Sequence, residues 1–343
     1  MTAKTRYFLI GSVLVLILGL SIGVVAYYGG MPSGLFSANR GPAELKYMPG
    51  DTAVVAYANV RDVMNSELRQ RLRKFQGASE EGRNEFKNET GIDIERDIDH
   101  VVVGVRPKTD AKTPRGLAIV SGRFDSTKIE SLATGHGGIV EQYRGKRIVV
   151  VKGGHKAEGE PTGREEELAM AFLSPGVVAL GTSDMVRLAV DRETGGGSVL
   201  QNAEMMKLVD GLDDPSLWAV GRFDALTAHA TLPTEVTDRV PPLTWFAASG
   251  RVNGGLQAVV KAEAKDEQGA ANLRDIIRGF VALARMQTDA KPGVKAMLPD
   301  IQLSGEGREV AVSFAVTTDM LDAIEAAHAA GQMKKPVTGE PIK

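Results

Sequence analysis

The apolar residues of this chain form one long uninterrupted run near the N-terminus and, after residue 50, short alternating and helical patterns. The long run covers residues 7–28 and contains no charged side chain. About 20 apolar residues suffice to cross a bilayer as a helix, so the run predicts a transmembrane helix. Lys4 and Arg6 precede it and no charge follows for eleven residues, which predicts residues 1–6 in the cytoplasm and the remaining chain outside.

A cleaved secretory signal is the alternative interpretation of the same run. Signal peptides have shorter apolar regions and end at a cleavage site of small residues. Here the only tolerable cleavage pattern, at residues 24–26, lies inside the apolar stretch, which favours a retained anchor. Both interpretations place residues 29–343 outside the cytoplasm.

Two segments flank the part of the chain that is predicted to fold. Residues 29–44 are rich in Gly, Pro and Ser, which predicts a flexible tether without secondary structure. Residues 331–343 are polar and contain prolines, which predicts a disordered tail.

The first predicted α+β half covers residues 45–195. It opens with an apolar strand, continues with an amphipathic helix, and then alternates strands with helices. The expected strands are 53–60, 100–105, 116–124, 139–143, 147–151, 168–173 and 177–180, and the expected helices are 61–75, 79–89, 126–133 and 183–190.

The second predicted half covers residues 196–330 and repeats this order. Its clearest signal is Asn253-Gly254, a dipeptide typical of tight hairpins, between two apolar strands. The expected strands are 216–223, 243–252, 256–264, 301–305 and 309–316, and the expected helices are 224–239, 266–286 and 319–329. On the long helix, one apolar stripe is predicted to face the core: Leu273, Ile276, Ile277, Phe280 and Ala284.

Short sequence matches relate the two halves. Residues 182–185 (TSDM) and 317–320 (TTDM) each begin a final helix, and Gly116-Leu117 corresponds to Gly255-Leu256. The fold class predicted from this order is α+β, with a duplicated β-α-β-β-α-β-β-α unit after the single N-terminal transmembrane helix. The alternative is that caps and hairpins recur in any α+β chain. Because hairpins dominate, we expect a mainly antiparallel sheet with helices on one face.

Composition narrows the classes of partner and chemistry. With 41 basic and 43 acidic residues, the net charge of −2 argues against nucleic acid as a partner, because phosphate binding needs a basic face. The chain has no cysteine, which excludes a lipoprotein anchor, a thiolate nucleophile, a cysteine zinc site and disulfides. An exported chain without disulfides fits a bacterial envelope protein.

No motif assigns a catalytic, cofactor-binding or metal-ligating residue. The five histidines are scattered without metal-ligand spacing, and neither a nucleophile elbow nor a phosphate-binding glycine loop occurs. Asp97, Asp99 and His100 could bring carboxylates near an imidazole, although a solvated turn that leads into a buried strand is the favoured explanation of this acidic stretch. Trp218 and Trp245 fall within predicted strands, which favours core packing over ligand stacking.

Two short segments resemble a family of uncharacterised bacterial membrane-anchored proteins, a domain of unknown function. Residues 48–52 (MPGDT) before an apolar strand are similar to the Pro-x-Asp-Thr segment that follows the single span of that family. Residues 90–98 (TGIDIERDI) are similar to its Thr-Gly-hydrophobic-Asp segment. The resemblance covers roughly residues 45–325. It implies architecture and an envelope location, and it brings no catalytic residue.

Three functional hypotheses follow. The first is a membrane-tethered extracytoplasmic binding protein, held in the bilayer by residues 7–28, whose partner is another envelope protein. The second is a small-ligand sensor or carrier with an apolar pocket between the halves. The third is a hydrolase whose site assembles across the halves, with Asp97, Asp99 and His100 as the first residues to test.

Overall fold

The computed structural model describes residues 41–73, 79–106, 115–152, 167–193, 195–227, 240–289 and 301–323. The predicted transmembrane helix at 7–28 and the predicted tail at 331–343 lie outside these ranges. Within them, no helix is both long enough and apolar enough to cross a membrane.

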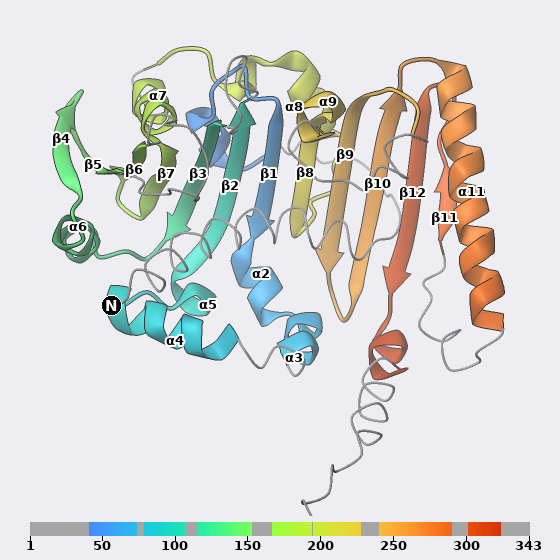
Figure 1. Cartoon of the computed structure of the whole chain (residues 1–343), viewed down its shortest axis with the longest axis horizontal. Helices are drawn as coiled ribbons and strands as arrows, with labels where there is room; N and C mark the ends of the chain where they lie inside the picture. The colour runs from blue at the N-terminus through green and yellow to red at the C-terminus, as the bar shows by residue number, and fades with distance from the viewer. Residues whose placement is uncertain are drawn as a thin grey trace, which may run out of the picture.

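The described strands form one twelve-stranded sheet in which every neighbouring pair is antiparallel (Figure 1). The strand order is β11-β12-β10-β9-β8-β1-β2-β3-β7-β6-β5-β4. The predicted mixed fold with a mainly antiparallel sheet is therefore confirmed. The strands are β1 (Val54–Asn59), β2 (Ile98–Arg106), β3 (Arg115–Gly122), β4 (Ile139–Tyr143), β5 (Lys146–Lys152), β6 (Glu167–Ser174), β7 (Val177–Thr182), β8 (Leu217–Arg222), β9 (Leu243–Val252), β10 (Leu256–Ala264), β11 (Gln302–Ser304) and β12 (Glu309–Val316).

The two halves share this sheet and meet where β1 pairs with β8, with Ala56 opposite Ala219. In each half the third strand pairs with the last one, β3 with β7 and β10 with β12. The registers agree with the sequence matches, because Leu117 lies opposite Gly181 and Leu256 lies opposite Val316. The first half contains an additional hairpin, β4–β5, which has no counterpart among the described residues of the second half.

Helices cover both faces of the sheet, which corrects the expectation that they lie on one. Central strands carry apolar residues at successive positions, so both faces need cover. Val102 packs in one core cluster with Met185, whereas its neighbour Val101 packs in another with Val60. The helices are η1 (Ala43–Tyr47), α2 (Val60–Asn65), α3 (Glu67–Arg73), α4 (Ser79–Thr90), α5 (Ile94–Asp97), α6 (Ser126–Gly135), α7 (Ser183–Glu193), η2 (Val199–Gln201), α8 (Ala203–Asp210), α9 (Phe223–Thr227) and α11 (Glu267–Asp289), and residues 318–323 are also helical.

The predicted helix at 61–75 is two helices, α2 and α3, that are separated at Ser66. The Ser66 hydroxyl donates to the carbonyl of Val63 at 2.7 Å and accepts from the backbone N–H of Arg69 at 3.1 Å. Serine favours such local bonds to the backbone, which end one helix and begin the next.

The last residues of the predicted tether are folded. Residues 43–47 form the 3₁₀ helix η1, in which Glu44, Leu45 and Tyr47 are buried. The folded part of the chain therefore includes residues 43 and 44, although their Gly/Pro/Ser-rich surroundings predict a flexible tether. The remainder of the predicted tether, residues 29–40, lies outside the described ranges.

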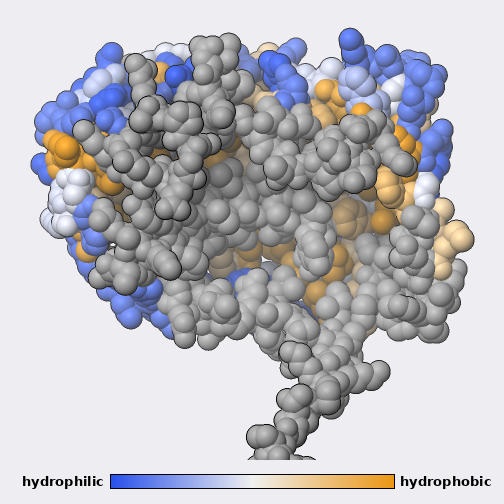
Figure 2. All heavy atoms as spheres, viewed as in Figure 1, coloured by the Kyte–Doolittle hydropathy of each residue, from blue (hydrophilic) through white to orange (hydrophobic). Residues whose placement is uncertain are grey.

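The apolar stripe of α11 faces the core only in its first half. Leu273 is buried, but Phe280 is 55% exposed, which corrects the prediction that both face inward. A 23-residue helix is about 35 Å long, whereas the eight residues of β12 span about 26 Å, so the C-terminal turns of α11 have little sheet to pack against. Figure 2 shows hydrophobic residues at the surface beside hydrophilic ones on the side where α11 lies.

Candidate functional site

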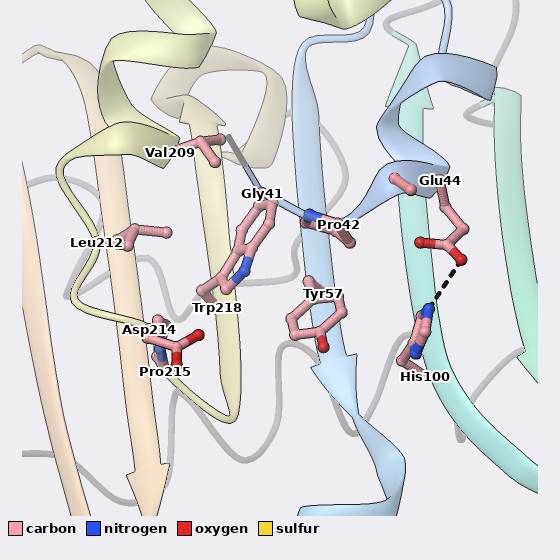
Figure 3. A pocket seen from close by; sticks show the side chains of 11 residues that line it. Gly41, Pro42, Glu44, Tyr57, His100, Val209, Leu212, Asp214, Pro215 and Trp218 are labelled. Atoms are coloured by element: carbon pink, nitrogen blue, oxygen red, sulfur yellow. Dashed lines mark hydrogen bonds and ion pairs between the residues drawn. The ribbon is translucent and has the colours of Figure 1, made fainter. Parts of the chain in front are cut away.

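A cavity of about 320 Å³ lies on the sheet where the two halves meet (Figure 3). Its walls come from η1 and the residues before it, from β1, β2 and β8, and from α8 with the turn that follows it. The lining residues are Gly41, Pro42, Ala43, Glu44, Tyr57, His100, Val209, Leu212, Asp214, Pro215 and Trp218. Both halves therefore contribute to one site.

Three rings form a row across neighbouring strands of this face. Tyr57 on β1 lies directly opposite Trp218 on β8, and their ring centroids are 5.7 Å apart in a stacked arrangement. On the other side of Tyr57, the ring of His100 on β2 lies 6.0 Å away at an angle of 45°. Figure 3 shows the row running from Trp218 through Tyr57 to His100. Side chains on one face of adjacent strands meet in this way.

A bulge in β2 sets the position of His100. Ile98 lies opposite Gly122 and His100 lies opposite Ser121, so Asp99 is the additional residue. Such a bulge re-aims the side chains beside it. As a result, His100 and Ser121 are neighbours on adjacent strands and share one partner.

That partner is Glu44 of η1, which is only 8% exposed. Its Oε1 accepts a hydrogen bond from the Ser121 hydroxyl at 2.7 Å and lies 2.8 Å from Nε2 of His100. Burial acts to raise the pKa of Glu44, but the hydrogen bonds from His100 and Ser121 outweigh it and lower this pKa from 4.5 to about 2. The same hydrogen bond to Glu44 raises the pKa of His100 despite its partial burial.

Carboxylates also act on the phenol of Tyr57. Burial is the main reason that the pKa of Tyr57 is raised from 10.0 to about 12, and the charges of Asp62, Glu44 and Asp214 add to it. The phenol of Tyr57 therefore stays neutral at physiological pH.

The remaining wall is mostly apolar, and most of it comes from the second half. Val209 on α8 and Leu212 lie on the far side of Trp218, and Pro42 lies close to Tyr57 (Figure 3). The segment at Asp214 turns sharply, since this residue has a φ of 36°, in the left-handed region that aspartate tolerates better than other non-glycine residues.

The structure separates the three residues considered for hydrolysis. Asp97 accepts from the backbone N–H of Asp93 at 2.8 Å, and Asp99 forms an ion pair with Arg61. Only His100 of the three lines the cavity. Trp218 belongs to the core, as predicted, and it also lines the cavity, which the sequence interpretation did not anticipate.

The arrangement supports binding better than covalent chemistry. The hydroxyl of Ser121 donates to Glu44, the carboxylate that also binds His100, so serine and histidine do not form a nucleophile–base pair. Among the described residues, no group of three or more His, Cys, Asp or Glu side chains is placed to hold a metal ion.

Sequence reasoning missed Glu44, Tyr57, Ser121 and Asp214 as site residues. Glu44 falls at the end of the predicted tether, and the other three occur in ordinary strand or turn patterns. A usable signal was the segment after Pro42, where Leu45, Tyr47 and Met48 are apolar within a Gly/Pro/Ser-rich region. All three are buried in the structure.

Comparison with known proteins adds little to this description. No family model and no curated protein matches the chain. Two solved structures are similar in fold, crystal forms III and I of a protein named TP0453. Form III shares 8% sequence identity with a TM-score of 0.46, covering 83% of this chain and 99% of that one. Form I shares 10% identity with a TM-score of 0.44, covering 82% and 96%. At this level of similarity neither structure bears on what this chain binds.

Proposed function

We propose that this chain is a membrane-tethered, extracytoplasmic binding protein that holds a small ligand in the cavity between its two halves. One observation carries the proposal: the cavity at the β1–β8 junction is lined from both halves by apolar side chains and a few polar groups. Small-molecule sites are concave, mostly apolar and supplied with a small number of placed polar groups.

The membrane tether rests on the sequence. Residues 7–28 are apolar and uncharged, and Gly41, the first described residue, lines the cavity. The twelve residues between them span at most about 45 Å when extended. A ligand site on this body would therefore stay close to the bilayer surface.

We further infer that the two halves arose by duplication of one β-α-β-β-α-β-β-α unit. The matching registers at Leu117 and Leu256 support it, as does the placement of the shared sheet about the β1–β8 pair. The packing of the helices that follow β7 and β12 also agrees, because Met185 lies in one core cluster with Leu117 and Met320 lies in another with Leu256, the counterpart of Leu117.

An envelope protein partner is a second proposal, with a different observation in its favour. Strand β4 ends the sheet order, and its Ile139 is 56% exposed. Exposed edge strands pair with other chains. If a partner binds there, Ile139→Lys abolishes its recovery with the full chain from solubilised envelopes, while recovery unaffected by Ile139→Lys contradicts this edge as the site.

The cavity proposal is tested with a mixed panel of cationic, neutral and anionic small molecules. The full chain in non-ionic detergent is scored by thermal unfolding and by tryptophan fluorescence, because Trp218 lines the cavity. We expect at least one class to raise the unfolding temperature and shift the fluorescence. Leu212→Phe, which fills the cavity from its apolar wall, should remove both effects. A panel in which no molecule has either effect contradicts the proposal.

A further inference from the structure

We infer that the C-terminal half of α11, residues 278–289, lies on the surface of the bilayer that holds the chain and inserts exposed apolar side chains among the lipid headgroups. This contact rests on the membrane tether proposed above and is independent of the cavity. It gives the folded part of the chain a second attachment to the membrane, through a lipid surface that carries anionic headgroups.

The N-terminal half of α11 is fastened to the sheet. Leu273 is buried, and Ile277 packs beside it in the same core cluster. The guanidinium of Arg274 donates to the backbone carbonyls of Gly307 at 3.0 Å and of Glu309 at 2.7 Å. Figure 1 shows α11 along the outer edge of the sheet, beside the short strand β11. Beyond Ile277, no described side chain of α11 belongs to a core cluster.

The C-terminal half exposes apolar side chains instead. Four large apolar side chains are exposed among the described residues, and two of them are Phe280, at 55%, and Met286, at 71%. The small residues Gly279 and Ala282 beside them are exposed as well. Phe280 lies seven residues after Leu273, which is about two helical turns along the same side of α11. The apolar stripe therefore continues beyond the part of the helix that packs on the sheet.

The charges around this stripe favour a lipid surface with anionic headgroups. Residues 275–297 carry four basic side chains against two acidic ones, Asp275 and Asp289, whereas the whole chain has a net charge of −2. The basic residues are Arg278, Arg285, Lys291 and Lys295. Arg278 pairs with Asp275 at 2.8 Å, and because both side chains are exposed this pair contributes little and can give way to a lipid phosphate. Basic residues beside apolar ones are typical of helices that lie in a membrane interface.

The tether brings this helix within reach of a bilayer. Twelve residues separate the predicted span at 7–28 from Gly41, and they extend over at most about 45 Å. A contact between a tethered body and its own membrane forms at a high effective concentration. Two large apolar side chains can therefore hold a contact that would be too weak for a protein free in solution.

A second copy of the chain fits this helix face less well than lipid does. Pairing two copies through α11 would bring together two segments that each carry an excess of positive charge. Like charges repel one another, whereas anionic headgroups attract the same side chains. The charge balance thus favours the lipid surface.

The test measures directly whether α11 contacts lipid. The chain has no cysteine, so Phe280→Cys and Met286→Cys each provide a single site for the fluorophore NBD. The labelled full chain is inserted into nanodiscs of phosphatidylcholine with or without phosphatidylglycerol, and doxyl-labelled lipid is the quencher. We expect about twofold quenching at both positions in the anionic discs and less in the neutral ones, because an interfacial helix buries its apolar face between headgroups and acyl chains.

Control positions and variants accompany these labels. Asp275→Cys labels the polar side of the same helix, and Leu200→Cys labels an exposed apolar position on η2. Neither of these two labels should be quenched. Phe280→Ser should remove the quenching of the label at Met286→Cys, whereas Leu200→Ser should leave it unchanged. Phe280 and Leu200 are both exposed, so these serine variants should fold as the unmodified chain does.

The outcomes distinguish the α11 contact from the tether. Equal quenching at all four positions, or none on α11 in a chain that copurifies with the nanodiscs, would overturn the α11 contact and leave the tether standing. If the labels on α11 are shielded from aqueous iodide only when two chains share a disc, the face belongs to a second copy and the lipid contact is wrong. A chain that does not associate with nanodiscs contradicts the tether, and the α11 contact fails with it.

Discussion

His100 Nε2 lies 2.8 Å from Oε1 of Glu44, although 56 residues separate them in the chain. The contact joins η1, the segment through which the chain enters the sheet, to β2 near the centre of the sheet. Because Glu44 also lines the cavity, one polar contact fixes the entering segment and shapes the candidate site.

Replacing the buried carboxylate tests how much this contact contributes. Glu44→Gln keeps the shape of the side chain but removes the charge that strengthens its bonds with His100 and Ser121. We expect a loss of about 1–2 kcal/mol in the free energy of unfolding, measured by urea denaturation of the full chain. Glu67→Gln is the control, since that exposed glutamate pairs with Arg71 at the surface and should change stability by less than about 0.5 kcal/mol. Equal losses of unfolding free energy in the two variants would show that the buried contact stabilises the protein no more than the exposed ion pair does.

The same contact makes stability depend on pH. The pKa of Glu44 is lowered from 4.5 to about 2, so its contribution is present above pH 4.5 and is lost as the pH falls toward 2. The pKa of His100 is raised above 6.5, so the contribution of its charge is present below pH 6.5 and is lost as the pH rises through the raised pKa. The two shifts describe one interaction, which is strongest between pH 4.5 and 6.5.

Two variants identify which residue causes the loss of stability at low pH and which causes it at high pH. His100→Gln retains an N–H donor for Glu44 but does not titrate, so the loss of stability on the alkaline side should disappear while the acidic side remains. Glu44→Gln should remove the loss of stability at low pH and the loss at high pH. The measurement is the free energy of unfolding of the full chain between pH 2 and 9. An unchanged alkaline side in His100→Gln would mean that other groups cause it.

The local strand patterns of this fold were readable from the sequence. The hairpin β9–β10 has the predicted bounds, 243–252 and 256–264, because the Asn253-Gly254 turn lies between two apolar strands. The helix after Asp125 begins as predicted, since that carboxylate accepts from the backbone N–H of Lys128 at 3.0 Å. These elements depend on neighbours within a few residues, which the sequence displays directly.

The site was far less predictable because its contacts are distant in sequence. The sequence places His100 beside Asp97 and Asp99, whereas its partner in the structure is Glu44. Proximity along the chain suggested those partners, and the bulge in β2 separates them by directing Asp99 toward Arg61. A composition rich in Gly, Pro and Ser hid Glu44 in a supposed tether. Neither the bulge in β2 nor the packing of η1 against the sheet produces a periodic pattern of apolar residues in the sequence.

The bulge that directs His100 depends on a glycine in the adjacent strand. A Cβ on Gly122 would lie 2.1 Å from the carbonyl oxygen of Asp97, a backbone atom that cannot move freely. Gly122→Ala should therefore cost about 1–3 kcal/mol in unfolding free energy. Gly116→Ala, in the same strand, is the matched control, because a Cβ there meets nothing within 4 Å and stability should change by less than about 0.5 kcal/mol.

A functional readout accompanies this pair of variants. If Gly122→Ala displaces β2 at the bulge, the fluorescence response of Trp218 to the binding panel should weaken, whereas Gly116→Ala should respond as the unmodified chain does. A Gly122→Ala chain with unchanged stability would contradict the close approach of β3 to Asp97.

The two halves of α11 should differ in their contribution to stability. Leu273 is 8% exposed and packs with Ala264, Ala270 and Val310, so Leu273→Ala creates a cavity and should cost about 2–4 kcal/mol. Phe280 lies seven residues further along α11 and is 55% exposed, so Phe280→Ala should change the free energy of unfolding by less than about 0.5 kcal/mol. Urea denaturation of both variants in the full chain measures the difference. A loss of 2 kcal/mol or more in Phe280→Ala would restore the inward-facing stripe that the sequence predicts, because only a packed phenylalanine loses that much on truncation.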